Sequence, residues 1–107
     1  MSYRVVFTET AKSDLRDIAF NLLERTRDKA VAKRIVMELQ TSCETLKTFP
    51  ESGAIPKDRI LVSNGYRFLT QREYLLFYTF DRRKSTVYII AVIDGRRDYV
   101  RILKRYL

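Results

Sequence analysis

Residues 74–93 read YLLFYTFDRRKSTVYIIAVI, and this stretch decides the fold. It holds two unbroken apolar runs of strand length, Tyr74–Phe80 and Thr86–Ile93, which are rich in aromatic and β-branched side chains. Such runs are typical of strands that are buried on both faces. The segment between them, Asp81–Ser85, is short, polar and cationic, so the two runs are predicted to pair as an antiparallel hairpin. We expect this hairpin to form the centre of a sheet.

A charged segment follows the second run directly. Asp94-Gly95 has the composition of a turn, and Arg96-Arg97-Asp98-Tyr99 comes next. Side chains on a loop that is held by a rigid strand are well placed for binding. We therefore take this segment as the first candidate for a functional site.

The first half of the chain has helical periodicity. Tyr3–Thr8 is rich in strand formers and predicts a first strand. Apolar residues at positions 11, 15, 18, 19, 22 and 23 then form one helical face, with Thr8 as its N-terminal cap. Asp28 is the predicted cap of a second helix, with apolar residues at positions 32, 35, 36, 39, 43 and 46. Cys43 lies on this apolar stripe, and we interpret it as a small core residue.

The remaining segments complete an α+β pattern. Phe49–Gly53 ends the second helix, because it contains a proline and a glycine. Ile60–Val62 is predicted to be a short strand, Asn64-Gly65 a tight turn and Tyr66–Thr70 the next strand. Tyr99–Leu107 is predicted to be a short basic helix or tail. We expect one domain over residues 1–107, with an N-terminal strand and an antiparallel two-helix hairpin packed on a mainly antiparallel sheet of four to five strands.

The composition indicates a basic protein. The chain has 107 residues and a formal net charge of +8, from 21 Lys and Arg against 13 Asp and Glu. Residues 82–107 alone contain eight basic and two acidic side chains. A basic surface attracts polyanions such as nucleic acid, or an acidic protein, at long range. The alternative is a solvated basic face without a partner.

The residue types exclude several classes of chemistry. With no histidine and one cysteine, the usual zinc and copper sites, Ser–His and Cys–His nucleophile pairs and an internal disulfide are absent, so we expect no metal and no cofactor. No apolar run approaches the length of a membrane span, and residues 1–6 lack the apolar core of a signal peptide. We therefore expect a cytoplasmic protein without a membrane partner.

Several short patterns, in this order along the chain, resemble the RelE/ParE superfamily of bacterial toxins. They are Tyr3-x-Val-x-Phe-Thr8, Ala11-x-x-Asp-Leu15, Leu46-x-x-Phe-Pro-x-x-Gly53, Gly65-Tyr-Arg67, Tyr74-Leu-Leu-Phe-Tyr78 and Gly95-Arg-Arg-Asp-Tyr99. The resemblance implies a type II toxin–antitoxin system, in which an antitoxin encoded beside the toxin neutralises it and the free toxin arrests growth. It also implies that the antitoxin contributes an amphipathic helix or an extended segment, laid over a hydrophobic groove and a basic surface.

The superfamily has two known chemistries, and fold alone does not choose between them. RelE-like members cut mRNA in the ribosome, whereas ParE-like members inhibit DNA gyrase without hydrolysis. Cleavage needs cations on the phosphate, an acid and a base. The catalytic candidates for charge stabilisation are Arg67, Arg96 and Arg97, and Tyr99 is a candidate acid or base-stacking residue. The candidates for the base are Lys57, Glu73 and Lys104.

One departure favours the ParE-like function. RelE-like members usually carry an arginine in the central strand, and the matching position here is Leu75. The Phe-Pro-x-x-Gly pattern and the Gly-Arg-Arg-Asp segment also look ParE-like. We therefore prefer gyrase inhibition, with ribosome-dependent mRNA cleavage as the alternative and a general nucleic-acid-binding module as the third hypothesis. The predicted target-binding residues are Lys57, Arg67, Arg82, Arg83, Arg96, Arg97 and Arg101.

The candidate residues also have structural interpretations. Arg67 could pair with Asp94 or Asp98, and Tyr99 could pack beneath the terminal segment. One of Arg96 and Arg97 could hold Asp98 or a backbone carbonyl at the strand end, which would leave the other free to meet a partner.

Overall fold

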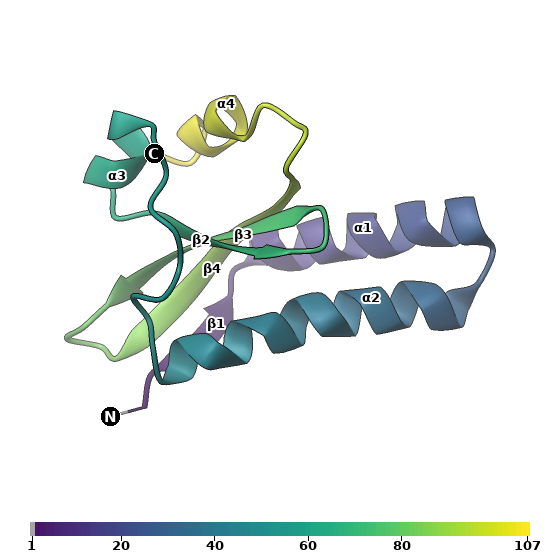
Figure 1. Ribbon diagram of the computed structural model, residues 1–107, viewed down its shortest axis with the longest axis horizontal. Coiled ribbons are helices and arrows are strands. Elements are labelled where there is room, and N and C mark those ends of the chain that lie inside the picture. The colour runs from purple at the N-terminus through teal and green to yellow at the C-terminus, as the bar shows by residue number, and fades with distance from the viewer. Residues whose placement is uncertain (1) are drawn as a thin grey trace.

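A central antiparallel hairpin organises the sheet. In the computed structural model, which describes residues 2–107, strand β3 (Tyr74–Asp81) pairs along its length with β4 (Thr86–Asp94). Strand β2 (Arg67–Gln71) pairs antiparallel with the other edge of β3. Strand β1 (Arg4–Phe7) pairs parallel with β4, so the order is β1-β4-β3-β2 (Figure 1). The predicted hairpin is therefore confirmed as the centre of a four-stranded sheet.

Two long helices follow β1 and form an antiparallel pair. Helix α1 (Glu9–Thr26) begins after Thr8, whose hydroxyl accepts a hydrogen bond from the Ala11 amide at 3.2 Å. Helix α2 (Lys29–Ser42) begins after Asp28, whose carboxylate accepts from two amides of the first turn. These caps satisfy amides that have no partner within the helix, which confirms both predicted starts. A 3₁₀ turn, η1 (Cys43–Lys47), continues the second helix.

The helical hairpin covers one face of the sheet and extends beyond its edge (Figure 1). The main core lies between them. Its buried side chains include Leu15, Leu39, Cys43, Leu76 and Ile89. The interpretation of Cys43 as a core residue is therefore confirmed.

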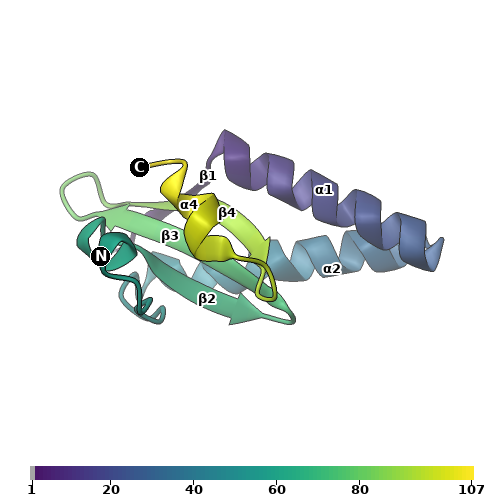
Figure 2. The same cartoon turned by 90° about the horizontal axis from the view of Figure 1, so that it is seen from above.

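The opposite face carries a smaller layer. Short helices α3 (Arg59–Ser63) and α4 (Tyr99–Lys104) pack there around buried Leu61, Phe77 and Leu103. Viewed from above, α4 lies across β3 and β4, on the side away from the long helices (Figure 2). The sheet is thus covered on both faces, which explains why its two central strands are continuous apolar runs.

The predicted fold class is confirmed, with one local correction. The prediction of a strand at Ile60–Val62 is wrong, because this segment lies within helix α3. The Asp58 carboxylate accepts hydrogen bonds from the Ile60 and Leu61 amides and so starts a helical turn, and Leu61 is fully buried. Over residues 2–107, no helix combines the length and apolar composition needed to cross a membrane.

Candidate functional site

The predicted site residues do not converge on one point. Arg82 and Arg83 lie in the turn between β3 and β4. Arg67 lies near them, because it pairs in register with Tyr78 toward the same end of β3. We call this group, Arg67 with Arg82 and Arg83, the turn end of the hairpin.

Arg96 and Arg97 lie at the opposite end of the hairpin, which we call the loop end. They follow Asp94, the last residue of β4, which pairs with Tyr74 at the start of β3. Tyr78 lies four residue steps after Tyr74 in β3, which is about 13 Å of strand. The turn end and the loop end are therefore two separate groups of arginines.

At the turn end, Arg67 binds the protein's own backbone. Its Nη1 donates to the carbonyl oxygens of Glu51 and Gly53, at 3.1 and 3.3 Å. Arg82 forms an ion pair with the Glu51 carboxylate. The sequence analysis offered Asp94 or Asp98 as a partner of Arg67, but Arg67 pairs with neither. It fixes the loop that follows the 3₁₀ turn.

Tyr78 anchors the same loop from below. Its hydroxyl donates to the Pro50 carbonyl at 2.7 Å and accepts from the Gly53 amide at 2.9 Å. Burial raises the pKa of this hydroxyl, so it stays protonated and remains a donor. A Cβ at position 53 would lie 2.5 Å from the Tyr78 hydroxyl oxygen, which explains the glycine in the Phe-Pro-x-x-Gly pattern.

At the loop end, Asp94 holds Arg96 in a fork. The Arg96 Nε and Nη2 atoms donate to the two carboxylate oxygens at 3.0 and 2.7 Å, and the Arg96 amide donates to one of them. These bonds lower the pKa of Asp94 to about 2. The Arg96 side chain is still 80% exposed. Arg97 is also exposed, and no ion pair of its side chain is found within residues 2–107.

Of the other candidates, Glu73 lies at the loop end, where its backbone carbonyl accepts a hydrogen bond from the Gly95 amide at 2.8 Å. The rest are packed, paired or exposed on other elements. The Tyr99 ring lies on Phe77, with centroids 5.2 Å apart, so this first residue of α4 packs the terminal helix against the sheet. Lys104 pairs with Asp58 at 3.5 Å. Lys57 is exposed in the loop before α3, and Arg101 is exposed on α4.

A polar cavity of about 360 Å³ opens at the loop end, between α1 and the ends of the central strands. Arg96 and Arg97 line it together with Tyr74. Helix α1 contributes Asp14 and Arg25 to the same wall. The cavity therefore presents both cations and carboxylates, at the edge of the sheet that β1 does not reach.

Residues 5–99 match the sequence model of a family described as the ParE toxin of the type II toxin–antitoxin system parDE. The chain belongs to the ParE toxin family. No curated protein matches the chain significantly by sequence.

Solved structures share the fold. A chain of the chromosomal ParDE system from Pseudomonas aeruginosa has a TM-score of 0.71 at 16% identity, covering 87% of this chain and 96% of that one. The toxin–antitoxin complex RelBE2 from Mycobacterium tuberculosis gives 0.61 at 23% identity, covering 88% and 99%. A mutant of Escherichia coli toxin RelE in the free state gives 0.66 at 18% identity and covers both chains fully. The RelE/ParE fold predicted from the sequence is confirmed.

Sequence reasoning did not place Asp14 at the site of this ParE-family chain. The available signal was its position on α1, three residues after buried Ala11 and four before buried Ile18. A carboxylate on the border of a buried helical stripe needs a polar partner. The partner lies on a strand remote in sequence, so the pairing could not be predicted.

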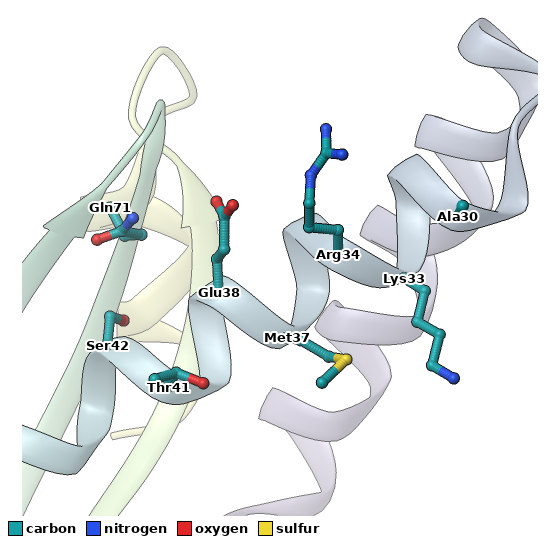
Figure 3. A pocket seen from close by; sticks show the side chains of 8 residues that line it. All are labelled: Ala30, Lys33, Arg34, Met37, Glu38, Thr41, Ser42 and Gln71. Carbon is teal, nitrogen blue, oxygen red and sulfur yellow. The ribbon is translucent and has the colours of Figure 1, made fainter.

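The outer side of the helical hairpin carries an apolar groove. A hollow of about 480 Å³ lies along α1 and α2, where Phe20 is 62% exposed and Met37 53% exposed. Lys29 and Lys33 lie at its margin. A second hollow of about 650 Å³ lies along α2 beside Gln71 of β2, and Figure 3 shows Met37 and Lys33 pointing away from Glu38. The two hollows share Lys33 and Met37, and we call them together the hairpin groove.

Proposed function

We propose that this ParE-family toxin arrests growth by binding DNA gyrase without hydrolytic chemistry, through the Arg96–Arg97 loop. The observation that carries the proposal is the separation of the turn end from the loop end. Phosphate cleavage requires charge stabilisers, an acid and a base within hydrogen-bond reach of one substrate. Here the cations lie in two groups separated by about 13 Å of strand.

The individual residues support the same choice. Arg67 is engaged by two carbonyls, Tyr99 is packed on Phe77, and Lys104 is paired with Asp58. Leu75 is apolar where the nuclease branch is expected to carry an arginine. Arg96 and Arg97 combine high exposure with a fixed backbone at the end of a central strand. A rim of exposed cations on a rigid support suits recognition of a protein or protein–DNA surface.

Ribosome-dependent mRNA cleavage remains the second hypothesis, because one observation favours it. A polar hollow of about 680 Å³ at the turn end is lined by Arg67 and Arg82 with Tyr88. Cations beside an aromatic ring are suited to single-stranded RNA. Under this hypothesis the functional surface is the turn end, so the two hypotheses make opposite predictions for the two groups of arginines.

The antitoxin partner is assigned to the hairpin groove. An amphipathic helix could bury its apolar side on Phe20 and Met37, and acidic flanking residues could meet Lys29 and Lys33. Phe20→Asp with Met37→Asp should prevent neutralisation by the antitoxin encoded beside the toxin while growth arrest persists. Unchanged neutralisation would show that the antitoxin binds elsewhere.

The decisive experiment compares targets directly. Purified toxin is added to gyrase in a supercoiling assay, and cells induced without antitoxin are pulse-labelled with thymidine and amino acid separately. We expect inhibition of supercoiling and an early fall in thymidine incorporation. An early fall in protein synthesis with mRNA cut at codon positions would overturn the proposal.

Two matched double variants locate the surface in the same assays. Arg96→Ala with Arg97→Ala removes two exposed cations from the loop end. Arg83→Ala with Lys84→Ala removes Arg83 of the turn end together with Lys84, the next exposed cation of the same turn. We expect only the first pair to abolish activity. If only the second pair abolishes activity, the target binds the turn end, and the assignment of the target to the loop end is wrong.

A further inference from the structure

Strand β1 is shorter than its neighbour, and this leaves part of the central sheet without a strand partner. The β1–β4 pairing ends where Phe7 meets Ile89. β4 continues to Asp94, so within residues 2–107 no strand pairs with its outer edge from residue 90 onward. Exposed sheet edges carry unpaired amides and carbonyls that need other partners.

The start of helix α1 covers this edge with side chains. The Thr8 amide donates to the Ile89 carbonyl at 3.1 Å, and the Thr8 hydroxyl lies 3.1 Å from the Ile90 carbonyl. Six residues after Thr8, Asp14 Oδ2 accepts from the Val92 amide at 2.9 Å. The carboxylate therefore takes the place of the carbonyl that a longer β1 would have supplied.

The Asp14 bond is well placed to control the loop end. Val92 is 3% exposed, so its amide has little access to water if Asp14 is lost. Two residues further on, Asp94 holds Arg96, and the Gly95 amide donates to the Glu73 carbonyl at 2.8 Å. The end of β4 is thus tied by Asp14 on its outer edge and by Glu73 on its inner edge.

Electrostatics place Asp14 beside the exposed arginine as well. Burial raises the pKa of Asp14, and the Val92 amide and the Arg97 guanidinium oppose this rise, while Asp17 adds to it. The same guanidinium helps to lower the pKa of Asp94. Arg97 therefore lies in the field of both carboxylates, one on α1 and one at the end of β4.

We propose that Asp14 is a positioning residue for the Arg96–Arg97 loop, acting through the Val92 amide. The inference rests on the proposed function, in which this loop contacts the target. It assigns to the Ala11-x-x-Asp-Leu15 pattern a role beyond helix packing: the helix sets the direction in which the strand end presents its arginines.

The test uses three variants of the full chain. Asp14→Ala removes the acceptor, Asp14→Asn keeps an oxygen that can accept from Val92, and Glu24→Ala removes an exposed carboxylate of the same helix that does not line the loop-end cavity. Amide hydrogen exchange is measured over residues 92–97 and over β2, and growth arrest is measured at matched levels of folded protein.

For Asp14→Ala we expect exchange at residues 92–97 to rise by about tenfold or more, with β2 unchanged, and toxicity to fall by about tenfold. Asp14→Asn and Glu24→Ala should stay within about twofold of the native protein. Native toxicity in folded Asp14→Ala would overturn the inference. So would uniformly faster exchange with a loss of toxicity that matches the folded fraction, because that pattern describes a purely structural residue.

Two further measurements cover an Asp14→Ala variant that does not fold and a toxin that does not act on gyrase. If Asp14→Ala does not fold, Asp14→Glu displaces the carboxylate by one methylene group, and the same local rise in exchange is expected. If native protein leaves gyrase unaffected, the proposed function fails, yet growth arrest and exchange in the Asp14 series still decide whether this residue positions the loop.

Discussion

The two ends of the β3–β4 hairpin use the same residue type for different purposes. At the turn end, Arg67 donates to two backbone carbonyls and Arg82 pairs with Glu51, so the arginines hold a loop. At the loop end, Arg96 is oriented by Asp94 but stays largely exposed, and Arg97 is exposed beside it. The difference teaches that the position of the acceptors matters: Arg67 is fixed on two backbone carbonyls of a loop, whereas the carboxylate that orients Arg96 leaves its side chain 80% exposed to a partner.

The comparison can be tested by substitutions, ordered here by their expected effect on the free energy of unfolding. The largest effect is expected at the turn end. Tyr78→Ala should lower the stability by about 3–5 kcal/mol, because it removes a fully buried ring. Tyr78→Phe keeps the ring and should cost about 1–3 kcal/mol, because the Gly53 amide loses its acceptor. Urea denaturation of both variants measures the difference, and a native midpoint for Tyr78→Ala would contradict the proposed anchor.

A glycine at each end provides a matched pair. Gly53→Ala places a Cβ 2.5 Å from the Tyr78 hydroxyl and should destabilise by about 1–3 kcal/mol. Gly95→Ala meets nothing closer than the Glu73 carbonyl oxygen at 3.5 Å and should change stability by less than about 0.5 kcal/mol. Thermal melts of the two variants should therefore differ clearly. Equal losses would mean that the turn-end loop is not more tightly packed than the loop end.

Arg67→Ala should have a smaller effect, about 1 kcal/mol, because its bonds to the Glu51 and Gly53 carbonyls are partly exposed to solvent. Growth arrest by the folded variant should persist. Arg67→Lys is the control, since it keeps the charge without the fork geometry of the guanidinium. Loss of toxicity in a fully folded Arg67→Ala protein would make the turn end functional and support RNA cleavage.

The double variant Arg96→Ala with Arg97→Ala should shift the melting temperature by no more than about 2 °C, because exposed ion pairs contribute little to stability. It should nevertheless abolish growth arrest. Circular dichroism melts together with induction in cells measure the two effects separately. If the double variant is as toxic as the native protein, the loop end is not the surface that binds the target.

The smallest effect concerns a single carboxyl group. The pKa of Asp94 is lowered to about 2 by the Arg96 side chain and amide, so the group titrates below its ordinary value of 3.8. Its contribution to stability is therefore present above about pH 4 and is lost as the pH falls toward about 2. Carbon-detected NMR titration should show this pKa, and Arg96→Ala should raise it. A pKa of Asp94 near the ordinary value of 3.8 in the native protein would show that the fork that orients Arg96 does not form.

Local pattern predicted most of the fold but not the roles of the arginines. The central hairpin, both long helices and their caps at Thr8 and Asp28 follow from periodicity and capping chemistry, which act over a few residues. Ile60–Val62 was assigned wrongly, because three apolar residues are too few to distinguish a strand from a helical turn. The Asp58 cap next to it carried the correct information.

By itself, the sequence determined the elements, their order and the apolar faces that bring them together, because each depends on spacing within one segment. Only the tertiary structure decided what Arg67, Asp14 and Tyr99 do. Their partners are the carbonyls of residues 51 and 53, the Val92 amide and the Phe77 ring. These groups are remote in sequence and meet only when the strands are in register. Whether a charged side chain binds within the protein or stays exposed therefore depends on the folded chain.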